Sequence, residues 1–381
     1  MRSRRSLVVM TAALLALAAC GGTKGSAGAG GAAPQGFTPP KLSALKALGT
    51  PEGQVNVVAW AGYAEDGSTD KSVNWVTPFE KETGCKVNVK IGASSDEMVN
   101  LIKTGQYDVV SASGDASLRL IAAGDVEPIN TSLIPNDADV FPALKKRPWN
   151  SVKDVEYGVP HGRGANVLLY RTDKVKPAPD SWSVVFDGAS PYKGHVTAYD
   201  SPIYIADAAL YLMHTKPELG IKNPYALDDK QFTAATDLLK KQNADTVVGT
   251  SWQIIANLAK AEKAPVAAVL PKEGATGWSD TWMVATKSQH KTCAYKWLNH
   301  IISPKVNAQV AEWFGEAPSN AKSCALTVDK NFCTTFHAAD ESYFSKVWYW
   351  TTPIKQCLDG RKGATCKDYG QWTTAWQQIK G

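Results

Sequence analysis

Short apolar runs alternate with segments of helical periodicity in the first part of the chain. Residues 55–59 form a compact apolar run of strand length, and residues 70–83 then place apolar side chains at helical spacing. Ser94 followed by Glu97 has the spacing of a capping box, which predicts the start of another helix. Strands that alternate with helices favour a mostly parallel sheet with helices on both faces. The predicted elements are strands at 55–59, 87–91 and 108–111, and helices at 70–83, from 94 onward, and at 116–123.

A second series of strands and helices follows. Residues 158–170 predict extended structure, because Val167, Leu168 and Leu169 lie at their centre. Residues 351–380 show neither the periodicity of a strand nor that of a helix, and they are rich in Trp. We therefore expect an irregular tail that is cross-linked by a disulfide. The other predicted elements are strands at 196–199, 247–248, 266–270 and 282–286, and helices at 182–186, 203–214, 232–241, 252–260, 293–302 and 306–314.

The first residues of the chain have a different pattern. Arginines precede the apolar run 7–19, which ends in Leu-Ala-Ala before Cys20. A basic segment, a short apolar segment and small residues predict a secretory signal over residues 1–19. The Cys directly after Leu-Ala-Ala resembles the lipobox of bacterial lipoproteins, which implies that Cys20 carries lipid. Residues 20–50 are then expected to form a flexible tether. A transmembrane anchor is the alternative, although the run is short for one, and Arg4-Arg5 leaves twin-arginine export open beside the general secretory route.

Composition places the rest of the chain among globular proteins. The hydrophobic fraction is 44% and the charged fraction 20%. The remaining length suits two domains of ordinary size. The net charge of +5 includes the arginines of the signal, and the densest basic run, residues 145–147, is expected to be a solvated loop. We therefore expect no nucleic-acid partner.

The chain has seven cysteines, and six remain if Cys20 carries lipid. An even number in an exported protein favours disulfides. Pairs that close short loops are expected first, and the two distant cysteines then pair with each other. A zinc site is the rival interpretation, but no Cys-x-x-Cys occurs. The expected disulfides are Cys324–Cys333, Cys357–Cys366 and Cys85–Cys293.

The usual sequence signatures of catalysis are missing. The chain has no Gly-x-Ser-x-Gly elbow and no Walker phosphate loop. Its six histidines are scattered, without a His-x-x-x-His pair. These observations predict neither a cofactor nor a metal, and they favour a binding protein over an enzyme.

A series of motifs carries a family resemblance over nearly all of the mature chain. They are VVAWAGY at 57–63, TPFEKETG at 77–84, YDVVSASGD at 107–115, YGVP at 157–160, PKEG at 271–274 and WSD at 278–280. In this order they resemble the spermidine/putrescine-binding proteins of ABC importers. The resemblance implies an α/β fold of two lobes, joined by a hinge, with the ligand in the cleft between them.

The resemblance also implies a set of pocket residues. Aromatic faces attract an ammonium group, and a carboxylate neutralises its charge. Asp280, between Trp278 and Trp282, suits this chemistry best. The alternative role for Asp115 is to cap the N-terminus of a helix. Asp207 is expected to face solvent. The expected ligand-binding residues are Trp60, Tyr63, Ser113, Asp115, Arg163, Ser201, Tyr204, Trp252, Trp278 and Asp280.

Three departures from the family pattern weaken the assignment of a polyamine as the ligand. Ser201 and Tyr204 stand where polyamine binders have acids, and His161 and Arg163 stand where they have aromatic residues. An arginine in the cleft would repel a polyamine unless a carboxylate pairs with it. The segment between Leu239 and Thr250 is also shorter than in related sequences.

The sequence therefore predicts a monomeric, lipid-anchored binding protein outside the cytoplasm. It is expected to deliver a small cationic amine to an ABC permease and its ATPase, and to attach to the membrane through lipid on Cys20. One alternative is a binder of an amino acid, betaine or carboxylate through Arg163. Another is an extracytoplasmic enzyme, marked by an acid–base pair such as His161 beside a carboxylate. The expected units are lobe I at 51–161 and 280–345, lobe II at 162–279, and a C-terminal segment, 346–381, near the hinge.

Overall fold

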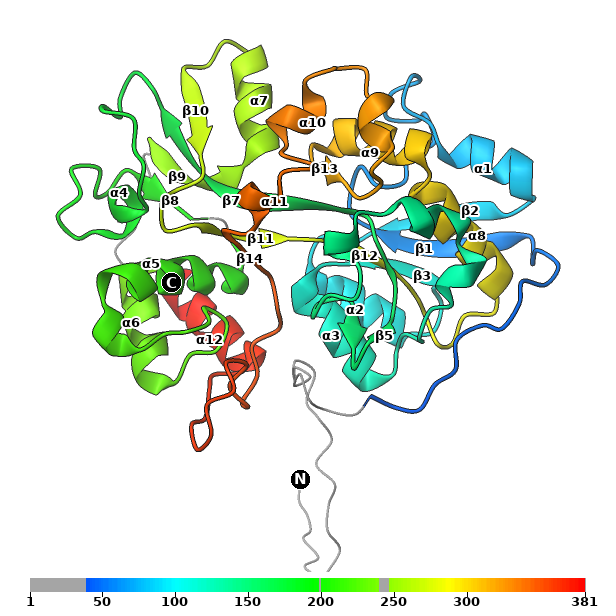
Figure 1. Ribbon diagram of the computed structural model, residues 1–381, viewed down its shortest axis with the longest axis horizontal. Helices are drawn as coiled ribbons and strands as arrows, with labels where there is room; N and C mark the ends of the chain where they lie inside the picture. Colours follow the sequence, from blue (N-terminus) through cyan, green and yellow to red (C-terminus); the bar gives the residue numbers. More distant parts are fainter. Residues whose placement is uncertain (1–38, 199, 240–246, 381) are drawn as a thin grey trace, which may run out of the picture.

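The computed structural model describes residues 39–198, 200–239 and 247–380 (Figure 1). The first of its two large sheets has the strand order β2-β1-β3-β12-β6. β1 pairs in parallel with β2 and β3, as the alternating pattern predicted, and β12 pairs antiparallel with β3 and β6. The bounds are Gln54–Ala59 (β1), Lys86–Ile91 (β2), Val109–Ala112 (β3), Val159–Pro160 (β6) and Thr281–Val284 (β12).

The second sheet has the order β14-β11-β7-β9-β8, with β10 and β13 also paired to β7. Most pairs in it are antiparallel, so the parallel pattern of the first sheet does not extend to it. A small hairpin, β4 (Ser151–Val152) and β5 (Val155–Glu156), stands apart. The bounds are Gly162–Arg171 (β7), Val196–Thr197 (β8), Val248–Trp252 (β9), Val266–Val269 (β10), Ala275–Trp278 (β11), Ala317–Pro318 (β13) and Val347–Tyr349 (β14).

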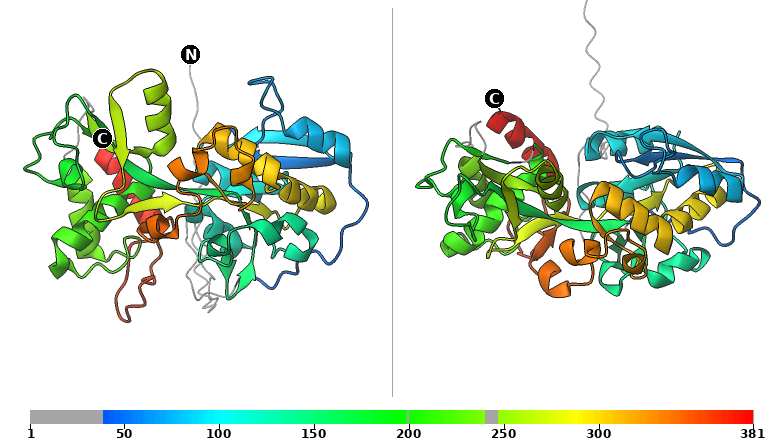
Figure 2. Two further views of the ribbon diagram at one scale, coloured as in Figure 1. Left: turned by 45° about the horizontal axis from the view of Figure 1, so that its top comes forward. Right: turned by 90° about the horizontal axis from the view of Figure 1, so that it is seen from above.

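The chain crosses between the sheets three times. One crossing, from β12 to β13, runs through residues 285–316, and the other two are direct steps from β6 into β7 and from β11 into β12 (Figures 1 and 2). We propose that these crossings form the hinge and divide lobe I, built on the first sheet, from lobe II, built on the second. The helices of lobe I are Val76–Thr83 (α1), Ser95–Lys103 (α2), Gly114–Ala123 (α3), Lys291–Ile301 (α8) and Pro304–Phe314 (α9). Those of lobe II are Ser183–Phe186 (α4), Ile205–Thr215 (α5), Asp229–Leu239 (α6), Gln253–Ala261 (α7) and Tyr369–Lys380 (α12).

Alternation along β1 explains how lobe I is packed. Val57 and Val58 are both buried, but they belong to apolar clusters on opposite faces of the sheet. The Ser94 hydroxyl caps α2 by accepting from the Glu97 N–H, and the Glu97 carboxylate accepts from the Ala93 N–H. The predicted capping box therefore forms, with its second bond shifted by one residue.

Two predicted segments differ from the structure. The helix expected over 70–83 begins only at Val76, because the Asp70 carboxylate accepts from the N–H and hydroxyl of Ser72 and holds a turn there. The tail expected to be irregular contains α12. Tyr369, Trp372 and Trp376 are buried on this helix at helical spacing, so its apolar face packs onto lobe II.

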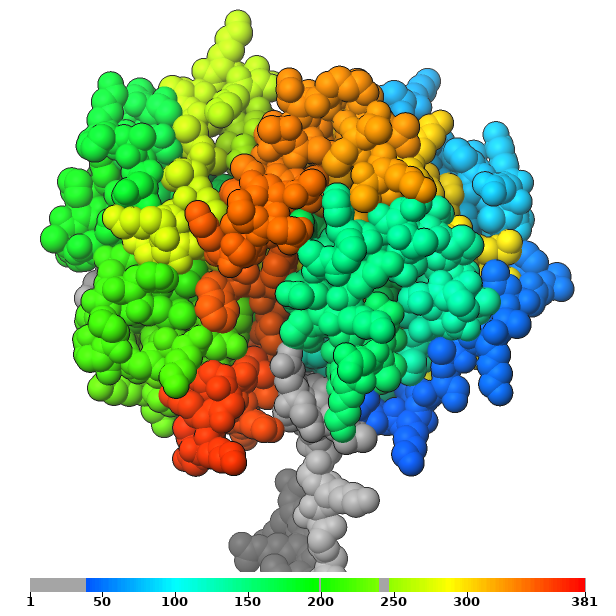
Figure 3. Space-filling view, in the orientation of Figure 1, coloured from blue at the N-terminus to red at the C-terminus, as the bar shows by residue number. Residues whose placement is uncertain are grey.

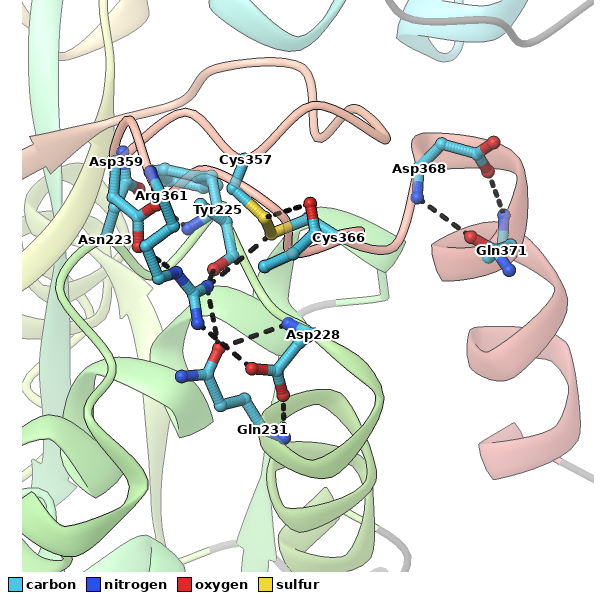
Figure 4. The surroundings of a disulfide bond; sticks show 12 residues. Asn223, Tyr225, Asp228, Gln231, Cys357, Asp359, Arg361, Cys366, Asp368 and Gln371 are labelled. Carbon is cyan, nitrogen blue, oxygen red and sulfur yellow. Dashed lines mark hydrogen bonds and ion pairs between the residues drawn. A yellow bond between two sulfur atoms is a disulfide. The ribbon is translucent and has the colours of Figure 1, made fainter.

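The structure contains the three expected disulfides, Cys85–Cys293, Cys324–Cys333 and Cys357–Cys366. The last one closes a loop that lies against lobe II (Figure 4). Arg361 in this loop donates to the Asp228 carboxylate (3.0 Å) and to the carbonyl of Ala226 (2.7 Å). The segment before the loop covers the boundary between the lobes on the face seen in Figure 3. It includes Phe332–Thr335 (α10) and Glu341–Phe344 (α11).

The predicted signal peptide, Cys20 and most of the predicted tether lie outside the described residues. Residues 39–50 lie along lobe I, where the Leu45 carbonyl accepts from the Asn130 side chain (3.1 Å). Most of the shortened segment, residues 240–246, also lies outside the described part. Within the described ranges, no helix is long and apolar enough to cross a membrane.

Candidate functional site

Four buried carboxyl groups from different elements lie around the junction of the lobes. Each is at most 2% exposed, although burying an ionised carboxylate is costly unless it is paired. By contrast, the buried Glu127 forms an ion pair with Lys291 (2.5 Å). In the described part of the chain, none of the four forms an ion pair with Lys or Arg. They are Asp115 on α3, Asp207 on α5, Asp280 between β11 and β12, and Glu316 between α9 and β13.

Asp280 lies at the second crossing between the lobes. One carboxylate oxygen accepts from the Ser113 hydroxyl (2.6 Å), and the other accepts from the Tyr63 hydroxyl (2.8 Å). Burial raises the pKa of Asp280 to about 6, and the charge of Asp115 adds to this, while the two hydroxyls oppose it. The structure thus brings together three of the expected site residues, Tyr63, Ser113 and Asp280.

Tyr63 is fully buried, and its ring packs against protein side chains. The ring centre lies 4.1 Å from that of His161 and 4.5 Å from that of Phe314. Burial and the neighbouring carboxyls raise the pKa of Tyr63 well above 10, so the phenol keeps its proton. Its hydroxyl therefore forms hydrogen bonds with the buried carboxyl groups, while protein side chains cover its ring.

Glu316 is a site residue that the sequence analysis missed. The Tyr63 hydroxyl lies 3.2 Å from Glu316 Oε2, and His161 Nε2 lies 3.2 Å from Oε1. A Cβ at Gly162 would lie only 2.4 Å from the Glu316 carboxyl carbon, so a larger residue there would displace this carboxyl group. Burial and the charge of Asp280 raise the pKa of Glu316 well above its usual range.

Asp115 lies in the first turn of α3, where Ser113 is the N-cap residue. The Asp115 carboxylate accepts from the Ser95 hydroxyl (3.0 Å). Burial raises its pKa to about 6, although Arg119 and Ser95 favour the charged form. The Asp115 carbonyl accepts from the Thr352 hydroxyl (2.8 Å), which ties α3 to the C-terminal segment.

Asp207 was expected to face solvent, and this was wrong. It is 1% exposed because α5 is covered on all sides, and one of its oxygens accepts from the Thr276 hydroxyl. Its other oxygen, Oδ2, is buried without a hydrogen-bond partner among the described residues. Burial raises the pKa of Asp207 to about 7. An acid therefore faces the interior of lobe II one helical turn beyond Tyr204, where the sequence analysis missed it.

Neutral side chains of lobe II connect to Asp207. The Asn166 amide donates to Thr276 Oγ1 (2.6 Å), and Asn166 Oδ1 accepts from Tyr204 and Trp252 (3.0 Å each). Two expected site residues thus meet at Asn166. Ser201 starts the turn before α5, where its carbonyl accepts from the Tyr204 N–H (3.0 Å).

Asp200, in the same region, lies outside this network. It is exposed and accepts from Trp376 (2.7 Å) and Lys380 (2.5 Å) of α12. Its role is therefore to hold the C-terminal helix on lobe II.

Trp60, Trp252 and Trp278 supply aromatic surface. Trp60 is half-buried between the two apolar clusters of lobe I. Trp278 packs over Gly164, where a Cβ would lie 2.7 Å from the indole ring. Trp252 and Trp278 both line a small hollow beside β7.

Arg163 pairs with the segment that covers the lobe boundary. Its guanidinium donates to the Ala338 carbonyl (3.0 Å) and to Glu341 (2.5 Å), and it lies 3.7 Å from the centre of the Phe344 ring. Arg163 and Asn166 are three residues apart on β7, so their side chains leave opposite faces of the strand. The cation is thus directed away from the Asp207 network, and it does not oppose a cationic ligand there.

Two α/β lobes joined by crossing strands, with polar groups gathered at the junction, define a two-lobed solute-binding protein. The sequence matches the family "Bacterial extracellular solute-binding protein" over residues 74–332, and the chain belongs to this family. The two-lobe fold implied by the motifs is confirmed.

Relatives and solved structures agree with this assignment. The spermidine/putrescine-binding periplasmic protein of Escherichia coli is 27% identical over 289 residues, covering 68% of this chain and 80% of its own. The putrescine-binding periplasmic protein PotF of E. coli is 28% identical over 287 residues, covering 66% and 75%. A putative spermidine/putrescine ABC transporter from Listeria monocytogenes has a similar fold, with TM-score 0.71 and 18% identity over 86% of this chain and 99% of its own.

Proposed function

We propose that this protein captures a polyamine-like cation outside the cytoplasm and delivers it to the permease and ATPase of an ABC importer. The observation that carries the proposal is the set of buried carboxyl groups that lack a Lys or Arg partner in the described chain. A ligand ammonium would supply the missing positive charge through charge-assisted hydrogen bonds. Relatives named for spermidine and putrescine support the same class of ligand.

The proposed mechanism is closure of the two lobes about the crossings near residues 162–164 and 277–280. Closure would place the ligand between lobe I, with Asp115 and Asp280, and lobe II, with Asp207. Trp60, Trp252 and Trp278 would cover its methylene groups. Lipid on Cys20 would hold the monomeric protein at the membrane beside its permease.

The alternative ligands have less support. A carboxylate ligand would need a free cation, but Arg163 is engaged by Glu341 and the Ala338 carbonyl. The enzyme alternative asked for a pair such as His161 beside a carboxylate, and His161 does lie 3.2 Å from Glu316. His161 Nδ1 accepts from Trp282 (2.8 Å), and burial lowers the pKa of His161 to about 3, so this histidine is a weak base for catalysis.

A thermal-shift screen of the purified protein tests the proposal. Putrescine, spermidine, amino acids, betaine and small dicarboxylates are compared, because a ligand of the native state raises the melting temperature by mass action. We expect a rise with putrescine or spermidine. A rise with only a zwitterion or an anion would contradict the proposal.

A further inference from the structure

The Tyr63 hydroxyl lies between two buried carboxyl groups. Its oxygen is 2.8 Å from Asp280 Oδ2 and 3.2 Å from Glu316 Oε2. A phenol has one hydrogen to donate, and an ionised carboxylate has none. If both acids were ionised, one of these contacts would set two oxygen atoms against each other without a hydrogen between them. A proton on one of the two carboxyl groups gives each of these contacts its own hydrogen.

The surroundings decide which acid carries it. Asp280 accepts from two hydroxyls, those of Ser113 (2.6 Å) and Tyr63, and is the better supported anion. Glu316 accepts from only one hydroxyl, that of Tyr63, among the described residues. Because His161 Nδ1 accepts from Trp282, His161 Nε2 carries the ring hydrogen, but this N–H, 3.2 Å from Glu316 Oε1, forms no hydrogen bond with it. Glu316 is therefore the acid that keeps its proton and can donate it to the Tyr63 oxygen.

The titratable groups packed around Glu316 come from three places in lobe I. They are Tyr63 after β1, His161 between β6 and β7, and Asp280 before β12, with Asp115 acting through Asp280. His161 accepts from the Trp282 indole at Nδ1, and burial lowers its pKa to about 3, so it stays neutral. The nearby Arg163 is held by Glu341. No positive charge among the described residues faces Glu316.

We infer that Glu316 is a neutral carboxylic acid in the ligand-free protein and ionises when a cationic amine binds beside Asp280. This inference rests on the proposed function. In the binding step the O–H bond of Glu316 breaks and its proton leaves to solvent. The new carboxylate accepts a hydrogen bond from the ligand ammonium, which keeps its own protons. A neutral solute cannot drive this release, so Glu316 selects for cations, and amine affinity rises with pH while Glu316 is protonated in the free state.

The protonation state can be read directly by NMR of protein labelled with ¹³C at the glutamate side-chain carboxyl. The purified protein is compared at pH 7 with and without putrescine, and Glu316→Gln assigns the resonance. We expect a protonated carboxyl signal that shifts to the ionised position when putrescine binds. Titration calorimetry in two buffers of different ionisation enthalpy should show proton release on binding, and Glu316→Gln should lower this release by about one proton per ligand. Glu82→Gln, at an exposed glutamate of α1, is the matched control and should behave like the wild type.

Each outcome decides a different claim. An ionised Glu316 in the ligand-free protein at pH 7 would overturn the inference. So would putrescine binding without proton release, and in that case the proposed function would stand. If no polyamine binds, the proposed function and the release step both fail, whereas the free-state NMR signal still shows whether Glu316 holds its proton.

Discussion

The two lobes hold their buried acids in different ways. In lobe I, the charge of Asp115 raises the pKa of Asp280, and the charge of Asp280 raises the pKa of Glu316. Hydroxyl groups donate hydrogen bonds to Asp115 and Asp280. In lobe II, Asp207 lies at the end of a chain of neutral groups, Thr276 and Asn166. Lobe I thus has several acids close together next to the hinge, whereas lobe II has one acid, Asp207, surrounded by neutral polar side chains. A dication would find an anion in each lobe, and a monoamine would need only lobe I.

The largest expected effect comes from Asp280→Asn in lobe I. Asparagine can still accept from the Ser113 hydroxyl through its oxygen and can donate its amide to the Tyr63 oxygen, so the fold should persist, but the charge that faces the ligand is lost. Breaking a buried ion pair costs about 3–5 kcal/mol, and we expect putrescine affinity to fall accordingly. Titration calorimetry measures the loss, with the exposed Asp180→Asn as control. Unchanged affinity would remove Asp280 from the site.

The disulfides give a second contrast between the lobes. Cys85–Cys293 in lobe I joins positions 208 residues apart, whereas Cys357–Cys366 on lobe II joins positions 9 residues apart. A longer closed loop restricts the unfolded chain more. Replacing the first pair by alanine should therefore lower the free energy of unfolding by about 2–3 kcal/mol more than replacing the second. Urea unfolding measures both, and equal losses would argue against this origin of stability.

Asp207→Asn tests the contribution of lobe II. Losing a hydrogen bond to a charged group costs about 2 kcal/mol, so putrescine should bind more weakly by that amount. Butylamine, with one ammonium group, should bind the variant and the wild type equally well. A matching loss for butylamine would show that Asp207 does not bind the second ammonium.

Raising the pH should destabilise the ligand-free protein. The pKa of Asp115 and Asp280 is raised to about 6 and that of Asp207 to about 7. The folded state therefore holds protons that the unfolded state releases, and stability falls as the pH rises from about 4 to about 7. Melting curves across this range should show the decline, with a smaller one in Asp207→Asn. A melting temperature that rises with pH would contradict the raised pKa values.

The smallest effect on binding is expected for Arg163→Trp. Arg163 pairs with Glu341 on the strand face opposite Asn166, so its loss should lower the melting temperature but change putrescine affinity by less than about 0.5 kcal/mol. A large gain in polyamine affinity would show instead that this arginine opposes the ligand.

The sequence predicted lobe I better than lobe II, for physical reasons. The capping box at Ser94 and the strands of the first sheet follow local patterns. The motif that holds Asp280 lies where the chain crosses between the lobes, and Ser113 reaches it from the end of β3. Asp207 was missed because α5 is buried on all sides, so no polar face marks its orientation. Glu316 stands in a short link after α9, where only the folded chain brings it to Tyr63.

In the proposed mechanism, acids of both lobes bind one polyamine. A crystal structure of the protein with putrescine tests it most directly. We predict one ammonium group within hydrogen-bond distance of Asp280 and the other within hydrogen-bond distance of Asp207. Putrescine bound away from both carboxylates, or against lobe I only, would contradict the account.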